Sequence, residues 1–162
     1  MKGSAAGGVL VRPARPEDEG LVRRLVEDME GYDFAPEPFS RRFGELLGDA
    51  RRACFVVELD GSPAGYIALR VEHPLHHERP VAEVVELAVS PEARGQGLGA
   101  ALLGHACDYA RDEGCELIEV HSKVERTRAH RFYEREGMRK THVHLTMPLR
   151  PAAPGDTGGM LP

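Results

Sequence analysis

The spacing of apolar residues along the chain changes repeatedly between every second position and the three-to-four-residue rhythm of a helix. This change of period is typical of a domain that mixes helices and strands, so the expected fold class is α/β (α+β). Helical spacing predicts four helices, at 17–29, 37–47, 98–113 and 127–136. Strand-like runs predict six extended segments, at 9–11, 54–59, 64–71, 81–89, 115–120 and 138–147.

Two glutamates, Glu83 and Glu86, interrupt the apolar run at 81–89 and lie three residues apart. Strict alternation along a strand would place such a pair on opposite faces of the sheet. A β-bulge between them would turn both side chains to the same face. We therefore expect a bulge in this strand, with the two carboxylates on one side.

Glycines recur at 95, 97 and 99, between the run that ends at Val89 and the next predicted helix. Because glycines leave the backbone uncovered, the amides of the first helical turn can converge there on an anion such as a phosphate. A mononucleotide P-loop is excluded, since neither lysine nor a hydroxyl residue follows the last glycine. A dinucleotide motif is matched formally by Gly95, Gly97 and Ala100, but about 90 residues precede it, whereas this motif normally follows a fold's first strand. A plain glycine-rich turn is the other alternative.

Length and charge limit the number of domains and the classes of binding partner that the chain can have. A chain of 162 residues fits one domain of ordinary size. A formal net charge of −5 argues against binding to a nucleic-acid backbone, since such domains are usually strongly basic. No apolar run reaches the ~20 residues that cross a bilayer, and the three cysteines have no CxxC spacing. We expect a cytoplasmic protein with reduced cysteines and no nucleic-acid or membrane partner.

Three histidines, His73, His76 and His77, lie beside Glu72 and Glu78 in a predicted loop between two strands. Such side chains can bind a transition metal. Two prolines restrict this loop, however, and no fourth ligand stands at a fixed spacing. A mobile loop on the acceptor side is therefore expected, and no metal site.

The segment 84–99 resembles the acyl-CoA-binding motif of the GNAT superfamily of N-acetyltransferases. The signature of that motif is Gln or Arg, two residues, Gly, one residue, and Gly or Ala, and Arg94, Gly97 and Gly99 occupy it. The segment 129–138 is similar to the closing helix of the family. A similarity at three separate places, the start of the chain included, points to this family rather than to a plain turn.

The resemblance covers 9–147, which implies a single GNAT acetyltransferase domain there, with flexible tails at 1–8 and 148–162. It implies a central, mixed and mostly antiparallel sheet of six to seven strands, flanked by about four helices and splayed at the cofactor site. It also implies acetyl-CoA as co-substrate, with its pyrophosphate on the loop amides and its pantetheine along the strand that ends at Val89. The residues expected to bind it are Leu87, Ala88, Val89, Arg94, Gly95, Gln96, Gly97, Leu98 and Gly99.

Acetyl transfer to an amine needs a neutral nucleophile, yet an ammonium with a pKa of ~10.4 is free base in only about one molecule in a thousand near neutrality. Glu86 and Glu83 are the carboxylates expected to take this proton, directly or through a water molecule. The resemblance implies that Tyr133 is the general acid that protonates the leaving thiolate. His130 and His121 are the alternatives for that role.

The sequence does not identify the amine that accepts the acetyl group. Residues 128–142 are similar to the closing segment of aminoalkylphosphonate N-acetyltransferases. The overlapping segment 123–140 carries seven Lys or Arg against three Glu. This local positive charge suits an amine that bears an anionic group, or the phosphates of CoA. Arg126 stands where many relatives have an asparagine that contacts the cofactor, and is expected to bind it. The acidic remainder of the chain favours a cationic amine instead. We expect a small-molecule primary amine, attacked directly in a ternary complex.

A non-catalytic acyl-CoA-binding module, acting as a sensor or interaction domain with the same fold, is the alternative function. Glu86 and Tyr133 favour an enzyme, because a pure binder needs neither. A homodimer is common among relatives, and the extended run at 138–147 can supply a shared or exchanged strand to it.

Overall fold

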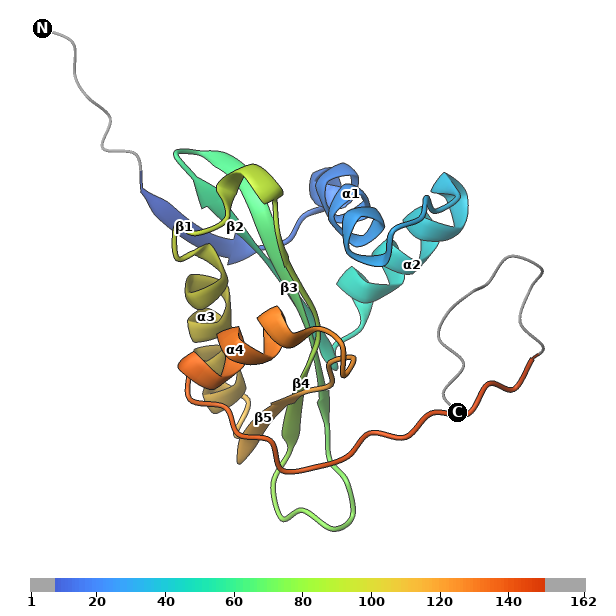
Figure 1. The fold of residues 1–162 in the computed structure, drawn as a ribbon, viewed down its shortest axis with the longest axis vertical. Coiled ribbons are helices and arrows are strands. Elements are labelled where there is room, and N and C mark those ends of the chain that lie inside the picture. Colours follow the sequence, from blue (N-terminus) through green and yellow to red (C-terminus); the bar gives the residue numbers. More distant parts are fainter. Residues whose placement is uncertain (1–7, 151–162) are drawn as a thin grey trace, which may run out of the picture.

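The computed structural model describes residues 8–150, which form a five-stranded sheet with helices on both faces (Figure 1). The strands follow chain order across the sheet: β1 (Val9–Pro13), β2 (Arg52–Leu59), β3 (Ser62–Glu72), β4 (Val81–Val89) and β5 (Leu117–Val120). The helices are α1 (Glu19–Glu30), α2 (Pro36–Gly48), α3 (Leu98–Asp112) and α4 (Thr127–Arg135), with short 3-10 turns η1 (Pro16–Asp18) and η2 (Pro91–Ala93). The pairs from β1 to β4 are antiparallel, and β4 pairs with β5 in parallel.

The sheet separates two apolar cores. Figure 1 shows the helices that cover them, with α1 and α2 on one face of the sheet and α3 on the other. Val56 and Tyr66 face α1 and α2, whereas Val57 and Ile67 face α3, and all four side chains are fully buried. Because both faces of β2 and β3 are covered, these strands read as nearly continuous apolar runs rather than as alternating ones. The expected mixed, mostly antiparallel sheet and its four helices are confirmed.

The predicted number of strands was too high. The segment 138–147, expected as a last strand, pairs with no strand among the described residues and runs away from the sheet (Figure 1). Its pattern is that of a strand, since alternate side chains are apolar, but a strand also needs a neighbour with free backbone groups. Met138 still packs against the core, but the later apolar side chains of this run, Val143, Leu145 and Met147, are 80–87% exposed. The expected tails, 1–8 and 148–162, fall almost entirely outside the described residues.

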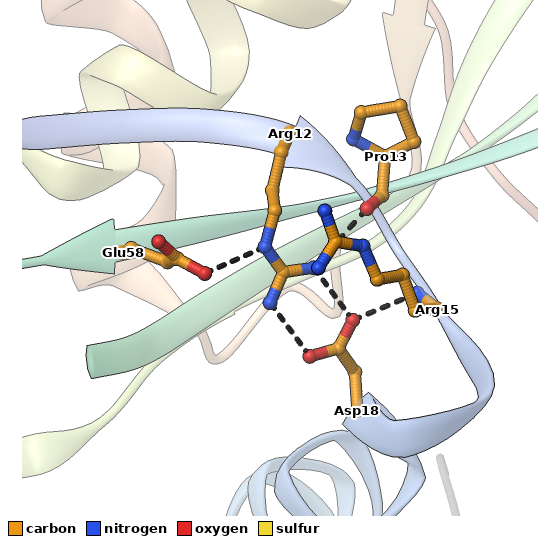
Figure 2. Close-up of polar contacts among 5 residues, drawn as sticks. All are labelled: Arg12, Pro13, Arg15, Asp18 and Glu58. Carbon is orange, nitrogen blue, oxygen red and sulfur yellow. Dashed lines mark hydrogen bonds and ion pairs between the residues drawn. The ribbon is translucent and has the colours of Figure 1, made fainter. Parts of the chain in front are cut away.

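Arg12 on β1 fixes the start of α1 through side chains that are almost closed to solvent (Figure 2). Its guanidinium donates to both carboxylate oxygens of Asp18, at 2.8 and 2.9 Å, and its Nε donates to Glu58 on β2 at 2.6 Å. Asp18 also accepts a hydrogen bond from the amide of Arg15 at 2.7 Å. The hydrogen bonds from Arg12 are the main reason why the pKa of Asp18 lies below its ordinary value. This network sets the direction of α1, whose far end reaches the candidate site.

Candidate active site

A bulge in β4 places both glutamates on one face of the sheet. Across the β3–β4 pair, Ala68 lies opposite Glu86 and Leu69 lies opposite Val84, so Val85 has no partner on β3. The extra residue reverses the alternation after Val84. Glu83 and Glu86 therefore share the face of the sheet that α1 and α2 cover, as expected from their spacing.

Glu86 is held by a buried tyrosine. The hydroxyl of Tyr66 donates to Oε2 of Glu86 at 2.8 Å, and the Tyr66 side chain is fully buried. Burial, followed by the nearby charge of Glu86, raises the pKa of Tyr66 far above its ordinary value, so that its hydroxyl stays a donor. One oxygen of Glu86 is thus fixed, and the other is available to a ligand.

Glu83 is held on both sides. Arg70 Nη2 lies 2.5 Å from Oε2 of Glu83, and Nδ1 of His121 lies 2.8 Å from Oε1. Burial alone would raise the pKa of Glu83, but the hydrogen bonds from His121 and Arg70 outweigh it and lower the pKa. Glu83 is therefore ionised at neutral pH.

β4 and β5 separate between the two glutamates, after the pair that Val84 forms with Val120. Their pairing joins Val81 to Leu117 and ends at the pair of Val84 with Val120. On its other side, β4 stays paired with β3 as far as Val89. The outer edge of β4 after Val84 therefore has no strand beside it in the described part of the chain, and it can accept an extended ligand as an added strand.

The glycine loop opens toward solvent at the start of α3. Gly95 and Gly97 adopt left-handed backbone angles, with φ of 76° and 77°, and a Cβ added at either would meet no atom within 4 Å. The amide of Ala101 is the first to reach a carbonyl of the loop, that of Gly97 at 3.0 Å, so the preceding amides of the turn are free for an anion. Gly99 differs, because a Cβ there would lie 3.3 Å from the ring of Phe132 on α4.

The end of α1 contacts both arginines that are expected to bind the cofactor, Arg94 and Arg126. Arg94 Nη2 lies 3.1 Å from Asp28, and Arg126 Nη2 lies 3.0 Å from Glu30. Lys123 also reaches Glu30, at 3.3 Å. Burial works against ionisation of Glu30, but the hydrogen bonds and charges of Lys123 and Arg126 prevail and lower its pKa. In this structure the two arginines are thus paired with carboxylates of α1.

Tyr133 lies on the opposite side of the sheet from the glutamates. It is half-buried against the core formed with α3, next to Phe132 with ring centroids 5.1 Å apart. Burial raises the pKa of Tyr133 to about 12, despite the opposing charge of Arg126. The phenol therefore keeps its proton at neutral pH, as a general acid requires.

Comparison with known proteins decides the family. Residues 19–138 match the family model described as "Acetyltransferase (GNAT) family". The chain belongs to the GNAT family. The resemblance found in the sequence is thereby confirmed, and as an N-acetyltransferase of this family the chain uses acetyl-CoA as its acyl donor.

Two relatives and one solved structure illustrate this similarity. The chain is 34% identical to the aminoalkylphosphonate N-acetyltransferase of Salmonella typhimurium, over 86% of this chain and 90% of the relative. It is 33% identical to the aminoglycoside N(6')-acetyltransferase type 1 of Stenotrophomonas maltophilia, over 91% of this chain and 99% of the relative. A solved aminoglycoside N-acetyltransferase in complex with CoA matches with a TM-score of 0.79 over 91% of this chain and 98% of its own. At 16% identity, that match shows the GNAT fold alone.

Sequence reasoning missed the side chains that hold the two glutamates of this GNAT chain. Tyr66 and Arg70 lie on β3 opposite the bulge, four residues apart and therefore on one face. Their spacing was visible in the sequence, but only the register of β3 against β4 shows which glutamate each one meets. His130, an alternative acid, bonds the carbonyl of Lys123 in the preceding loop at 3.0 Å.

The histidine-rich hairpin lies at the far end of β3 and β4 from the glycine loop. His77 contacts Glu116, and the ring of His76 is tilted against that of His77 with centroids 4.4 Å apart. Within residues 8–150, no three ligating side chains form a group that could hold a metal ion. None of the helices in the same range combines the length and apolar character that crossing a bilayer requires.

Proposed function

We propose that this chain moves the acetyl group of acetyl-CoA to the primary amine of a small molecule, by direct attack in a ternary complex. The observation that carries the proposal is the bulge at Val85. It aims Glu83 and Glu86 at the place where β4 and β5 part, and the same strand leads directly to the glycine loop. A carboxylate pair and an anion-binding loop thus flank one strand edge.

The loop fits the diphosphate of CoA. Left-handed angles at Gly95 and Gly97 turn the amides of the turn outward, and the open side of both glycines leaves room for a phosphate where a Cβ would otherwise stand. The unpaired edge of β4 suits the amide groups of pantetheine. We assign binding of acetyl-CoA to the residues of this strand end and loop, namely Leu87, Ala88, Val89, Arg94, Gly95, Gln96, Gly97, Leu98 and Gly99. Arg126 is also assigned to acetyl-CoA binding, with the phosphates of CoA taking the place of Glu30 as the partner of its guanidinium.

Proton removal from the acceptor is assigned to Glu86 and Glu83, acting directly or through a water molecule. Their shared face is the one from which an amine would approach past α1 and α2. Tyr133 is assigned as the acid that protonates the departing thiolate. Tyr133 lies on the α3 side of the sheet, so it can reach the sulfur of acetyl-CoA from the face opposite to the glutamates.

A small amine is supported by the two relatives named above, whose acceptors are an aminoalkylphosphonate and an aminoglycoside. Both are compact molecules that carry a primary amine and further charge. The three free cysteines, Cys54, Cys107 and Cys115, fit a reducing compartment, and we place the reaction in the cytoplasm.

We further propose a homodimer. Val143, Leu145 and Met147 lie at alternate positions of an extended segment and are each at least 80% exposed. An amphipathic strand without a neighbour gains backbone partners and apolar cover by pairing with a second copy. The segment 138–147 is assigned to that interface.

Release of CoA thiol from acetyl-CoA tests the function. A panel should contain aminoalkylphosphonates, aminoglycosides, polyamines and a lysine peptide, with acetyl-CoA binding followed by calorimetry. We expect turnover of at least one small amine, with initial-rate lines that intersect, because direct attack forms no acetyl-enzyme. Acetyl-CoA binding without turnover of any amine would favour the non-catalytic module instead.

A further inference from the structure

His121 is the first residue after β5, and its ring lies where β4 and β5 part. The last pair between these strands joins Val84 to Val120, so His121 stands directly beyond it. In the parallel register Glu83 pairs with Glu119, and His121, two residues further on, shares their face of the sheet. The imidazole is thus next to the gap in which the proposed function places the thioester.

The contact with Glu83 defines which ring nitrogen of His121 is free. Nδ1 lies 2.8 Å from Oε1 of Glu83, while Oε2 of that carboxylate is taken by Arg70. An ionised carboxylate only accepts hydrogen bonds, so Nδ1 carries the hydrogen and donates it. Nε2 of a neutral ring then has an unshared electron pair that can accept a proton.

Glu83 is itself poorly suited to take a proton directly. Both of its oxygens are held by donors, and those hydrogen bonds lower its pKa. A neutral imidazole has one nitrogen with a free electron pair, and histidine is the side chain that most often acts as a general base. A carboxylate that orients an imidazole is the arrangement by which many enzymes make a base.

We infer that His121 is the group that removes the proton from the acceptor amine, and that Glu83 is a positioning residue that holds its ring with Nε2 toward the gap. The inference rests on the proposed function and revises its proton-removal step, since the imidazole that Glu83 holds takes the proton in place of the carboxylate. The ring is 41% exposed and Glu83 16%, so Nε2 can meet an amine and then return a proton to solvent. The charged or titratable groups around this pair are Arg70 from β3, Glu119, which pairs with Glu83 from β5, and His144, whose ring is tilted against that of His121 with centroids 4.4 Å apart.

Nε2 of His121 takes one proton from the ammonium and becomes an imidazolium, and the freed lone pair of the amine forms the new N–C bond at the acetyl carbon. The C–S bond breaks, and the sulfur leaves as a thiolate that Tyr133 protonates. The second proton of the attacking nitrogen restores the phenol of Tyr133, directly or through water. The imidazolium gives its proton to solvent, so an ammonium and acetyl-CoA yield an amide, CoA thiol and one proton.

Replacement of His121 by asparagine tests the inference in the full chain, with the best amine of the panel. We expect kcat to fall about 100- to 1,000-fold, while the Kd of acetyl-CoA and the melting temperature stay close to those of the unchanged chain. Asp108→Ala, at an exposed carboxylate on the surface of α3, should retain full kcat. If the asparagine variant melts early, His121→Gln provides the second measurement.

A spectroscopic readout separates this role from a structural one. Long-range proton–nitrogen NMR correlations should show His121 with hydrogen on Nδ1 at pH 8, and Glu83→Ala should shift the ring toward the Nε2–H form. Retention of kcat within about threefold in His121→Asn, or an Nε2–H ring in the unchanged chain, overturns the inference while the proposed acetyl transfer stands. Absence of turnover by the unchanged chain on every amine overturns both.

Discussion

Replacement of Asp18 by alanine tests how much of the fold depends on the ion-pair network of Arg12. The change removes two hydrogen bonds from the Arg12 guanidinium and one from the amide of Arg15. The side chains of Arg12 and Asp18 are only 12% and 5% exposed, so water cannot readily replace the lost carboxylate. The guanidinium would remain nearly buried with half of its partners.

The expected cost follows from that burial. Removing one member of a buried ion pair usually costs about 3–5 kcal/mol, because the other charge is left uncompensated. Arg12 keeps its hydrogen bond with Glu58, so we expect the lower end of this range, about 3 kcal/mol. In a domain of this size 1 kcal/mol corresponds to roughly 2–4 °C, and Tm should fall by about 6–12 °C.

Urea unfolding with linear extrapolation measures the loss of unfolding free energy. Asp108→Ala is the matched control, since Asp108 pairs with Arg111 on the surface of α3 and these side chains are 75% and 71% exposed. Such exposed pairs contribute no more than about 1 kcal/mol. Equal losses in the two variants would refute the reasoning, because burial would then make no difference.

Acid provides a second test of the same network. Because the hydrogen bonds from Arg12 lower the pKa of Asp18, the stabilisation by its carboxylate is complete above the ordinary value of 3.8 and is lost as the pH falls through the lower folded-state value. The difference in unfolding free energy between the unchanged chain and Asp18→Asn should therefore be constant from about pH 7 to 5 and shrink below about pH 4. A difference that grows on acidification would contradict the assignment.

Three further variants test the site and the interface. Tyr133→Phe should lower kcat about 100-fold or more without changing the Kd of acetyl-CoA, and full activity would exclude the tyrosine as the acid. Gly97→Ala should weaken acetyl-CoA binding at least about tenfold by calorimetry and should also cost about 1 kcal/mol of stability, because alanine is strained at a φ of 77°. The control Gly114→Ala has the same φ and the same open space, so it should show the stability loss but no loss of binding. Leu145→Glu should convert the dimer to a monomer in light scattering, and Thr146→Glu, on the other side of the segment, should not.

The parts of the site that follow from local chemistry were predictable from the sequence. The glycine loop was visible because positive φ and bare amides demand glycine at particular positions, here Gly95 and Gly97. The bulge at Val85 was visible because two carboxylates three apart in an apolar strand conflict with strict alternation. Both signals lie within about six residues of chain.

The partners of those residues were not predictable in the same way. Tyr66 meets Glu86 across 20 positions of sequence, and His121 meets Glu83 across 38. Each contact depends on strand register, which a single shifted residue would change completely. The run at 138–147, which pairs with no strand of residues 8–150, shows the same limit. Alternation of apolar residues predicts that one face needs cover but does not say which chain provides it.

The two faces of the sheet explain how one gap can serve both proton transfers in the proposed reaction. The bulge keeps Glu83, Glu86 and, through register, His121 on the face of α1 and α2, whereas Tyr133 packs on the face of α3. A thioester held along the unpaired edge of β4 lies between these faces. The base then meets the amine from one side and the acid meets the sulfur from the other. Without the bulge, Glu86 would point toward α3, and the base side would lose a carboxylate.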